Sequence, residues 1–233
     1  MLNLQGYGVS LLSGMVLTVE AALLSLVVAI LLGAAGALAK TSQSMALQIV
    51  AGLYTTIVRG VPDLVLMLLI FFGGQMLINQ LAPMLGYEDY IDVSPFTAGV
   101  GTIGFIYGAY MTETFRGAIL AVPPGQLEAG QAFGMRPLQV FWRILLPQTI
   151  RHALPGLGNN WLVLLKATAL LSVLGLDDAL RKASLAAGAT REPFTFYLAA
   201  ALIYLLLTSI STLLFAWAER RAEQPYVRPA HGL

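Results

Sequence analysis

Five long apolar runs dominate this sequence, at 10–39, 48–81, 95–121, 149–175 and 194–218. A bilayer core of about 30 Å is crossed by a helix of about 20 apolar residues. The chain is 58% hydrophobic and 11% charged, whereas soluble domains carry about 25% charged residues. Its 233 residues leave no room for a separate soluble domain beside the five runs. The sequence therefore predicts an all-α, polytopic transmembrane helical bundle that forms one domain over 1–233.

Five spans place the two termini on opposite sides of the membrane, and the short loops indicate which side is which. Basic residues favour the cytoplasmic side. The first loop carries Lys40, the third carries Arg136 and Arg143, and the tail carries ERR at 219–221, while the second loop, YEDYID, is acidic. These loops predict an external N-terminus and a cytoplasmic C-terminus. The fourth loop, DDALRKASLAAGATREP, departs from the rule because three basic residues lie on the external side.

Charge and residue type exclude several kinds of site. The net charge is +1 and basic residues occur singly or in short groups, so no nucleic-acid surface is expected. Cysteine is absent, which rules out disulfides and thiolate metal sites. The chain also lacks the G-x-x-x-x-G-K-[ST] loop that cradles nucleotide phosphates.

The segment 124–147 is too polar to face lipid. VPPGQ at 122–126 ends the third run and starts a helix, because proline is tolerated in a first turn. The pattern predicts one short amphipathic helix over 126–135 and a second over 137–147. Together they cannot cross the bilayer, so we expect them to lie along its cytoplasmic surface.

Two interpretations of this surface segment remain open. It could be an interfacial helix on membrane lipid that only connects two spans. It could instead be a docking surface for a soluble partner, because the small residues Ala129 and Gly134 let another backbone approach and Glu128 offers a charge at the helix start.

The order of residues here resembles the coupling motif of permease subunits in ABC-type importers: Glu128-Ala129, then Gly134, then ILLPQ at 144–148. Longer stretches resemble the polar amino-acid branch of that family, and the similarity is greatest to the histidine and lysine-arginine-ornithine membrane subunits. These stretches are YTTIVRGVPDLVLMLLIF at 54–71, YGAYMTETFRGAILAVPPGQLEAGQAFGM at 107–135 and LPGLGNNWLVLLKATALLSVLG at 154–175. The resemblance covers nearly the whole chain.

The resemblance implies a type I ABC importer permease fold in the bacterial inner membrane. It implies a second, similar permease subunit, two copies of a cytoplasmic ATPase docked on Glu128, Ala129 and Gly134, and a periplasmic amino-acid-binding protein. ATP and Mg²⁺ would bind to the ATPase, leaving this chain without a cofactor or an enzymatic activity. The expected function is alternating access for basic and polar amino acids of the histidine, arginine, lysine and ornithine class.

Two positions differ from the common pattern of the family. Gly130 stands where many members have a third alanine, and we expect it to loosen the helix slightly. Asp63 stands where much of the branch has an apolar residue, as in the members that transport basic amino acids.

Ionisable residues within the apolar runs are costly, at least about 2.5–3.5 kcal/mol each on insertion scales, so each needs a partner or a water-filled cavity. Arg59 and Asp63 are four apart, and Glu113 and Arg116 are three apart, spacings that place each pair on one helix face. One interpretation is two structural ion pairs. The other is that these faces line the translocation path.

Lys166 lies about ten residues from each end of its run, beyond easy reach of the membrane surface. Asn159 lies two turns earlier on the same face, and Thr168 extends the polar residues. PGLG at 155–158 is expected to break the helix and free backbone groups for a cavity. Asn159, Lys166 and Thr168 are therefore candidate substrate-path residues, although a carboxylate on another span is an equally good partner for Lys166.

Two other classes remain as alternatives. A non-transporting membrane anchor of a redox complex usually shows intramembrane histidines for haem, and no run has a central one. An intramembrane enzyme needs a nucleophile and a base on facing spans. Ser172 and Lys166, six apart on one helix, do not meet that requirement.

Overall fold

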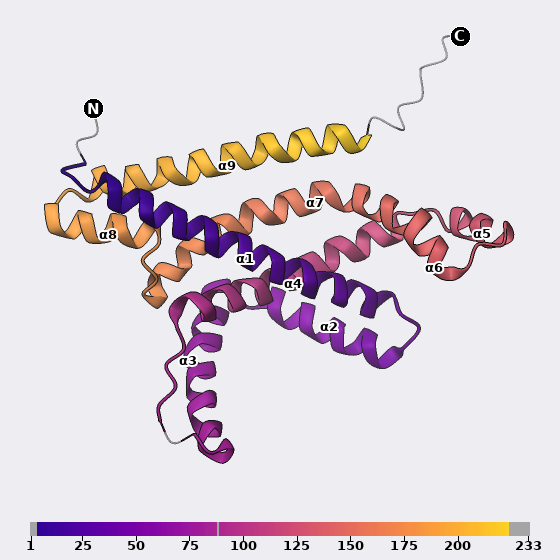
Figure 1. Ribbon diagram of the computed structural model, residues 1–233, viewed down its shortest axis with the longest axis horizontal. Coiled ribbons are helices and arrows are strands. Elements are labelled where there is room, and N and C mark those ends of the chain that lie inside the picture. The colour runs from indigo at the N-terminus through magenta and orange to yellow at the C-terminus, as the bar shows by residue number, and fades with distance from the viewer. Residues whose placement is uncertain (1–3, 88, 224–233) are drawn as a thin grey trace, which may run out of the picture.

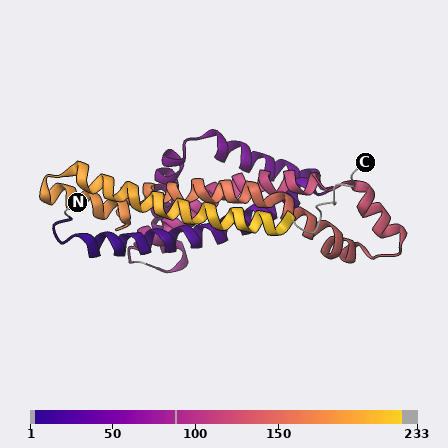
Figure 2. The same ribbon diagram turned by 90° about the horizontal axis from the view of Figure 1, so that it is seen from above.

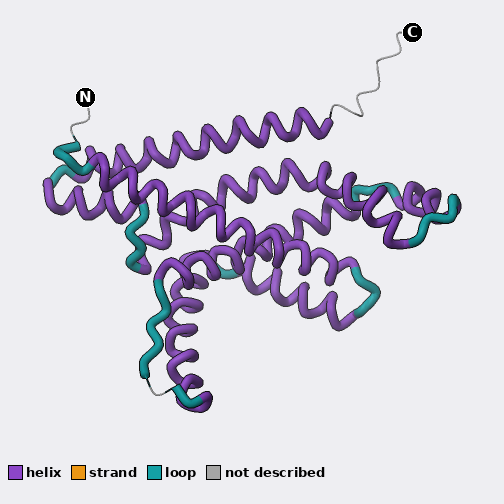
Figure 3. Tube along the Cα trace, viewed as in Figure 1, coloured by secondary structure: helices purple, strands orange, loops and turns teal. Residues whose placement is uncertain are grey.

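The computed structural model describes residues 4–87 and 89–223 of the chain. Their regular elements are all helical, and the described residues include no strand (Figure 3). In chain order the α-helices (α) and the 3₁₀ or π segments (η) are α1 (Gly8–Thr41), α2 (Met45–Gly60), α3 (Asp63–Leu81), η1 (Ala82–Leu85), α4 (Pro95–Leu120), α5 (Pro124–Ala132), α6 (Pro137–Val140), η2 (Phe141–Leu145), α7 (Leu146–Ala167), η3 (Thr168–Leu174), α8 (Ala179–Thr190) and α9 (Pro193–Glu223).

The long helices α1, α4, α7 and α9 form an elongated bundle (Figures 1 and 2). The short helices α5 and α6 extend beyond one end of the bundle, and α8 lies at the opposite end near the N-terminus. α3 leaves the bundle at a steep angle (Figure 1). The end with α5 and α6 is the one predicted to be cytoplasmic.

Among the described residues, four helical segments are long and apolar enough to cross a membrane: Gly8–Thr41, Asp63–Leu85, Pro137–Leu174 and Pro193–Ala222. α4, with 26 residues, is richer in glycine, threonine and tyrosine and packs against α1, α2, α3 and α7. The predicted all-α, multi-pass bundle is confirmed.

The predicted run 48–81 is two helices rather than one. α2 ends at Gly60, Val61 has an extended backbone (φ −109°, ψ 139°), and α3 begins at Asp63. Pro62 causes the break, because its ring disfavours a helical conformation in the residue before it. The expectation of one continuous span over 48–81 was wrong, and α3 takes a new direction after this bend.

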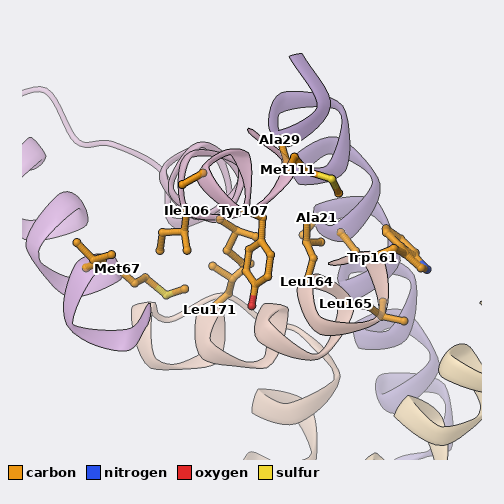
Figure 4. Packing of buried hydrophobic residues seen from close by; sticks show 14 of the residues in the cluster. Ala21, Ala29, Met67, Ile106, Tyr107, Met111, Trp161, Leu164, Leu165 and Leu171 are labelled. Carbon is orange, nitrogen blue, oxygen red and sulfur yellow. The ribbon is translucent and has the colours of Figure 1, made fainter. Parts of the chain in front are cut away.

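Close packing of α1 on α4 forms the centre of the bundle. A Cβ atom on Gly104 would lie 2.5 Å from Val28 Cβ, so the two backbones can approach only because residue 104 is glycine. Figure 4 shows the neighbouring apolar cluster, in which Met111 and Ile106 of α4 lie near Leu164 of α7 and Leu171 of η3. This core fixes the helices that carry the charged residues described below.

The external end contains a network of paired charges at the start of α8. Asp177 forms ion pairs with Arg181 at 3.5 Å and Lys182 at 2.8 Å. The hydrogen bond from Lys182 lowers the pKa of Asp177 below its usual value. Asp177 therefore forms ion pairs with two of the three basic residues that departed from the orientation rule.

Candidate functional site: the cytoplasmic arm and the charged pocket

The first candidate site is the cytoplasmic arm, residues 124–145, which comprises α5, α6 and η2. α5 ends at Ala132, and Gly134 then adopts a left-handed conformation with φ +81°. Met135 N donates to Gly130 O at 3.1 Å, and Gly134 N donates to Gln131 O at 2.9 Å. This is the hydrogen-bond pattern of a glycine C-cap, which residues with a Cβ adopt only with strain.

Space around the two glycines shows that they have different roles. No atom lies within 4 Å of the position that a Cβ on Gly134 would occupy. Gly130 is buried, and a Cβ there would lie 2.6 Å from Ile144 Cδ1. Gly134 therefore shapes the turn, while Gly130 lets α5 pack on η2.

The predicted docking residues Glu128, Ala129 and Gly134 are all exposed. Beside them lies Phe133, whose side chain is 90% exposed. The sequence analysis did not single out Phe133, although an aromatic residue directly before the capping glycine is a usable signal. A pocket of about 550 Å³ adjoins these residues and is lined in part by Ala129, Phe133 and Arg143.

The second short helix predicted over 137–147 is not a separate element. α6 continues through the π turn of η2 into α7, and Pro137–Leu174 forms one helical segment. Pro147 lacks an N–H and was expected to end the helix. It lies instead directly after the π turn, where Leu146 N bonds to Phe141 O, five residues back. The arm is therefore continuous with the spanning segment through the π turn.

The second candidate site is the charged pocket, a space of about 440 Å³ at the junction of α1, α2 and α4. Its lining residues are Lys40, Thr55, Thr56, Arg59, Gly60, Tyr110 and Glu113. Polar residues dominate this lining, unlike that of a lipid-facing surface.

Glu113 is the centre of the charges in this pocket. Lys40 Nζ donates to Glu113 Oε1 and, at 2.6 Å, to Thr55 Oγ1. Arg116 Nε donates to Glu113 Oε2 at 3.0 Å. The predicted Glu113–Arg116 pair forms, and Lys40 joins it from α1, a partner that local spacing could not reveal.

Arg59 and Asp63 do not form the ion pair that their spacing allowed. Arg59 lies over the Tyr110 ring at 5.4 Å from its centroid, while Asp63 Oδ2 accepts a hydrogen bond from Tyr107 Oη at 3.1 Å. The spacing argument assumed a continuous helix, which the bend at Pro62 interrupts. Arg59 lines the charged pocket and Asp63 does not.

Comparison with known proteins agrees with this arrangement. Residues 29–224 match the family described as the binding-protein-dependent transport system inner membrane component. This chain belongs to that family. It is an inner-membrane, multi-pass component of a binding-protein-dependent transport system.

Two relatives and one solved structure illustrate the relationship. The histidine/lysine/arginine/ornithine transport system permease protein HisQ of Salmonella typhimurium is 51% identical over 218 residues, which cover 94% of this chain and 95% of HisQ. The octopine transport system permease protein OccQ of Rhizobium radiobacter is 43% identical over 93% of this chain and 92% of OccQ. The crystal structure of an amino acid ABC transporter with histidines has a TM-score of 0.79 and 33% identity, covering 92% of this chain and 95% of that chain.

The remaining predicted residues, which lie on α7 and at the start of η3, are outside the charged pocket. Asn159 and Lys166 are exposed along α7, and Thr168 is buried, donating to Leu165 O at 2.7 Å. Asn160, which the sequence analysis did not consider, donates instead to Thr114 Oγ1 of α4 at 2.9 Å.

The break expected at 155–158 was wrong, because α7 is helical from Leu146 to Ala167 with Pro155 inside it. The glycines serve close packing instead. A Cβ on Gly156 would lie 2.6 Å from Thr114 Cγ2, and one on Gly158 would lie 3.0 Å from Phe215. Tertiary contacts with α4 and α9 therefore keep the helix intact despite the proline.

Proposed function

We propose that this chain is a permease subunit of an ATP-driven importer for basic and polar amino acids, of the histidine, arginine, lysine and ornithine class. Its similarity to HisQ over 94% of its length carries the proposal. The relatives are named as permease proteins of amino-acid and opine transport systems, so a non-transporting anchor is not favoured. This chain moves substrate by alternating access and does not itself hydrolyse ATP.

The cytoplasmic arm is the contact for a homodimeric ATPase, which binds ATP and Mg²⁺. Glu128, Ala129 and Gly134 are exposed at the tip of the bundle, and Phe133 offers an uncovered aromatic anchor. Aromatic residues carry a disproportionate share of binding energy at interfaces. Because α6, η2 and α7 are continuous, movement of the ATPase passes directly into the span.

The charged pocket and its surroundings form the substrate path of the importer. Asp63 offers an acidic group for a cationic side chain, and Arg59 offers a basic group for the substrate carboxylate. Glu113 pairs with Lys40 and Arg116 and would meet a cationic side chain after one of these pairs opens. The same path retains three further candidates, Asn159, Lys166 and Thr168, which lie outside the charged pocket. This mix of charges suits an amino acid better than an inorganic ion.

A second homologous permease subunit packs against α3, and the periplasmic amino-acid-binding protein delivers substrate at the α8 end. Only 11% of the spanning window that begins at Asp63 is buried within the chain. A helix of that length with so little internal packing provides the surface that a paired subunit requires.

Uptake by the reconstituted transporter tests the docking role of the arm. The test compares substitutions at two glycines, one within α5 and one in its C-terminal cap. Gly125 and Gly134 both have open space where a Cβ would be added, but only Gly134 has a positive φ. We expect Gly134→Val to insert normally and to abolish uptake and substrate-stimulated ATP hydrolysis, and we expect the same of a bulky residue at Glu128. Gly125→Ala should transport normally. Normal coupling in both the Gly134 and the Glu128 variants would disprove the docking role.

Asp63→Asn tests the substrate path. Arginine and histidine uptake should fall while the amount of assembled complex stays the same, because the change removes a charge and keeps the shape. Asp92→Asn, in the external loop, serves as the control. Normal uptake by Asp63→Asn would assign Asp63 a structural role through Tyr107.

A further inference from the structure

An apolar pocket of about 300 Å³ lies between α1, α4 and the first half of α7. Apart from Thr149, every residue that lines it is apolar, and the walls include Ala34, Ala37, Phe115, Phe141 and Ala153. The charged pocket shares no lining residue with it. Transport of a charged amino acid therefore has no evident use for this space.

The pocket lies within the segments that cross the membrane, toward their cytoplasmic ends. Its walls come from Gly8–Thr41 and Pro137–Leu174, two of the four spanning segments among the described residues. Leu38 and Ile150 line it and are 52% and 56% exposed, so the space reaches the surface of the chain. Trp142, 60% exposed and next to Phe141, is suited to the membrane interface.

Small side chains and an irregular helix create this space. Ala34, Ala37 and Ala153 leave room that larger side chains would fill, and Phe141 and Leu145 contribute from the π turn of η2. π turns are rare and occur frequently at functional sites. The hydroxyl of Thr149, four residues after the π turn, is buried and has no hydrogen-bond partner among the described residues.

We propose that this pocket binds an acyl chain of a phospholipid from the cytoplasmic leaflet. Water is a poor occupant, because an ordered water needs two to four polar partners. This assignment rests on the proposed function, in which the second permease subunit packs against α3, the spanning helix with the smallest buried share; α3 contributes no residue to the walls. The lipid chain is the apolar group that surrounds these helices at this depth.

Binding of the acyl chain depends on packing rather than on the hydrophobic effect, since a lipid tail is already in hydrocarbon. An empty apolar space loses dispersion contacts along its walls, and an acyl chain restores them. The chain would lie between the α1–α4 pair and the helix that carries the cytoplasmic arm. Lipid occupancy is thus placed to affect the movement of α7 against α1.

Photocrosslinking in the assembled transporter tests the proposal. The probe is a phosphatidylcholine with a diazirine on one acyl chain, incorporated into nanodiscs that hold the full complex, and labelled peptides are identified by mass spectrometry. In the unmodified protein, we expect labelling to concentrate on 30–38, 115–119 and 141–157 rather than on the exposed face of α9. Even labelling of all exposed apolar faces would overturn the proposal, as would the absence of labelling on these segments, which is the result expected if the second permease subunit covers them.

Three variants sharpen the test. Ala34→Phe fills the pocket and should lower labelling of its walls about five-fold or more, whereas Ala35→Phe, at an exposed position that does not line the pocket, should change it less than about two-fold. Thr149→Val should keep the labelling, because an acyl chain needs no hydroxyl. Unchanged labelling in Ala34→Phe, or its loss in Thr149→Val, would contradict an acyl-chain site.

Discussion

The cytoplasmic arm and the charged pocket hold their chemically important residues in opposite ways. In the arm, Phe133 and Trp142 are 90% and 60% exposed, and Glu128 is exposed. In the charged pocket, the side chains of Lys40 and Glu113 are only 16% and 21% exposed and bind each other. One region leaves its groups uncovered, while the other satisfies them within the chain.

The surrounding medium explains the difference. An unpaired charge within the bilayer costs several kcal/mol, so the chain supplies a partner for Glu113 from α1 and another from α4. Glu128 and Phe133, at the tip of the arm, are exposed and can bind a protein partner. Changes in the charged pocket should therefore alter the stability of this chain, and changes in the arm should alter assembly and coupling.

Glu113→Gln should have the largest effect on stability. The substitution keeps the shape of the side chain but leaves Lys40, whose side chain is only 16% exposed, without its carboxylate. We expect the complex to lose about 3 kcal/mol or more of unfolding free energy, measured by denaturant titration of the purified transporter.

Removing both charges provides the control for this variant. Lys40→Met combined with Glu113→Gln should recover much of the loss, because no lysine is then left without its carboxylate, and Arg116, whose side chain is 40% exposed, can be solvated. If Glu113→Gln alone were as stable as the unmodified protein, the contrast between the pocket and the arm would fail.

The sequence predicted the helical class and the exposed motif because both depend on local patterns. Apolar runs located the helices, and the order of Glu128, Ala129 and Gly134 located the arm. Such local patterns do not predict which residues of different helices contact each other. Lys40 and Glu113 are 73 positions apart, and no spacing rule connects them.

Three further errors share one cause, which is that the effect of a proline was predicted from the local sequence alone. Pro62 does break the second run, which was predicted to be continuous, whereas Pro147 and Pro155 lie inside helical structure that was predicted to stop. A proline removes one backbone hydrogen bond, and packing by neighbouring helices decides whether the helix survives. That packing depends on residues far away in the sequence.

Asp178 is a buried carboxylate at the external end of the molecule, and it can be compared with Glu113 in the charged pocket. It is fully buried, caps α8 through a 2.9 Å hydrogen bond from Arg181 N, and lies 3.4 Å from Tyr204 Oη. Burial raises its pKa to about 6. Between about pH 4 and 6 the folded chain binds more protons than the unfolded chain, so stability falls as the pH rises through this window, by at most about 3 kcal/mol.

Asp178→Asn should remove this pH dependence and keep the helix cap, because asparagine is also a good N-cap residue. The melting temperature of the variant should exceed that of the unmodified protein at pH 7.5 and approach it near pH 4. Asp177→Asn is the matched control. Its pKa is lowered by Lys182, so that variant should be less stable at pH 7.5 and should lose the difference in acid.

Phe133→Ala tests the arm with a smaller effect that should appear only in assembly. The ring is 90% exposed, so its removal should change the stability of the chain by less than about 0.5 kcal/mol. Affinity for the ATPase should weaken by about 1–2 kcal/mol, measured by binding of the purified ATPase to the permease pair in nanodiscs. The control is Leu138→Ala, at an exposed position of the same arm. It shows whether the loss of any exposed apolar side chain weakens affinity for the ATPase. Equal weakening by both variants would mean that Phe133 is no special anchor.

Gly130→Ala should have the smallest effect on uptake. It distinguishes the role of Gly130 from that of Gly134. The new methyl group would crowd Ile144 Cδ1 at 2.6 Å, the flexible end of a side chain that can rotate away, and would make ordinary contacts with Val140 Cγ2 at 3.4 Å and Met135 Sδ at 3.5 Å. Alanine favours a helix over glycine by about 1 kcal/mol, which offsets the crowding, so we expect uptake to stay near normal. Gly134→Ala meets no atom but must adopt φ +81°, a conformation that costs an alanine about 1 kcal/mol. If Gly130→Ala impaired uptake more than Gly134→Ala, contact between α5 and η2, rather than the shape of the cap, would control coupling.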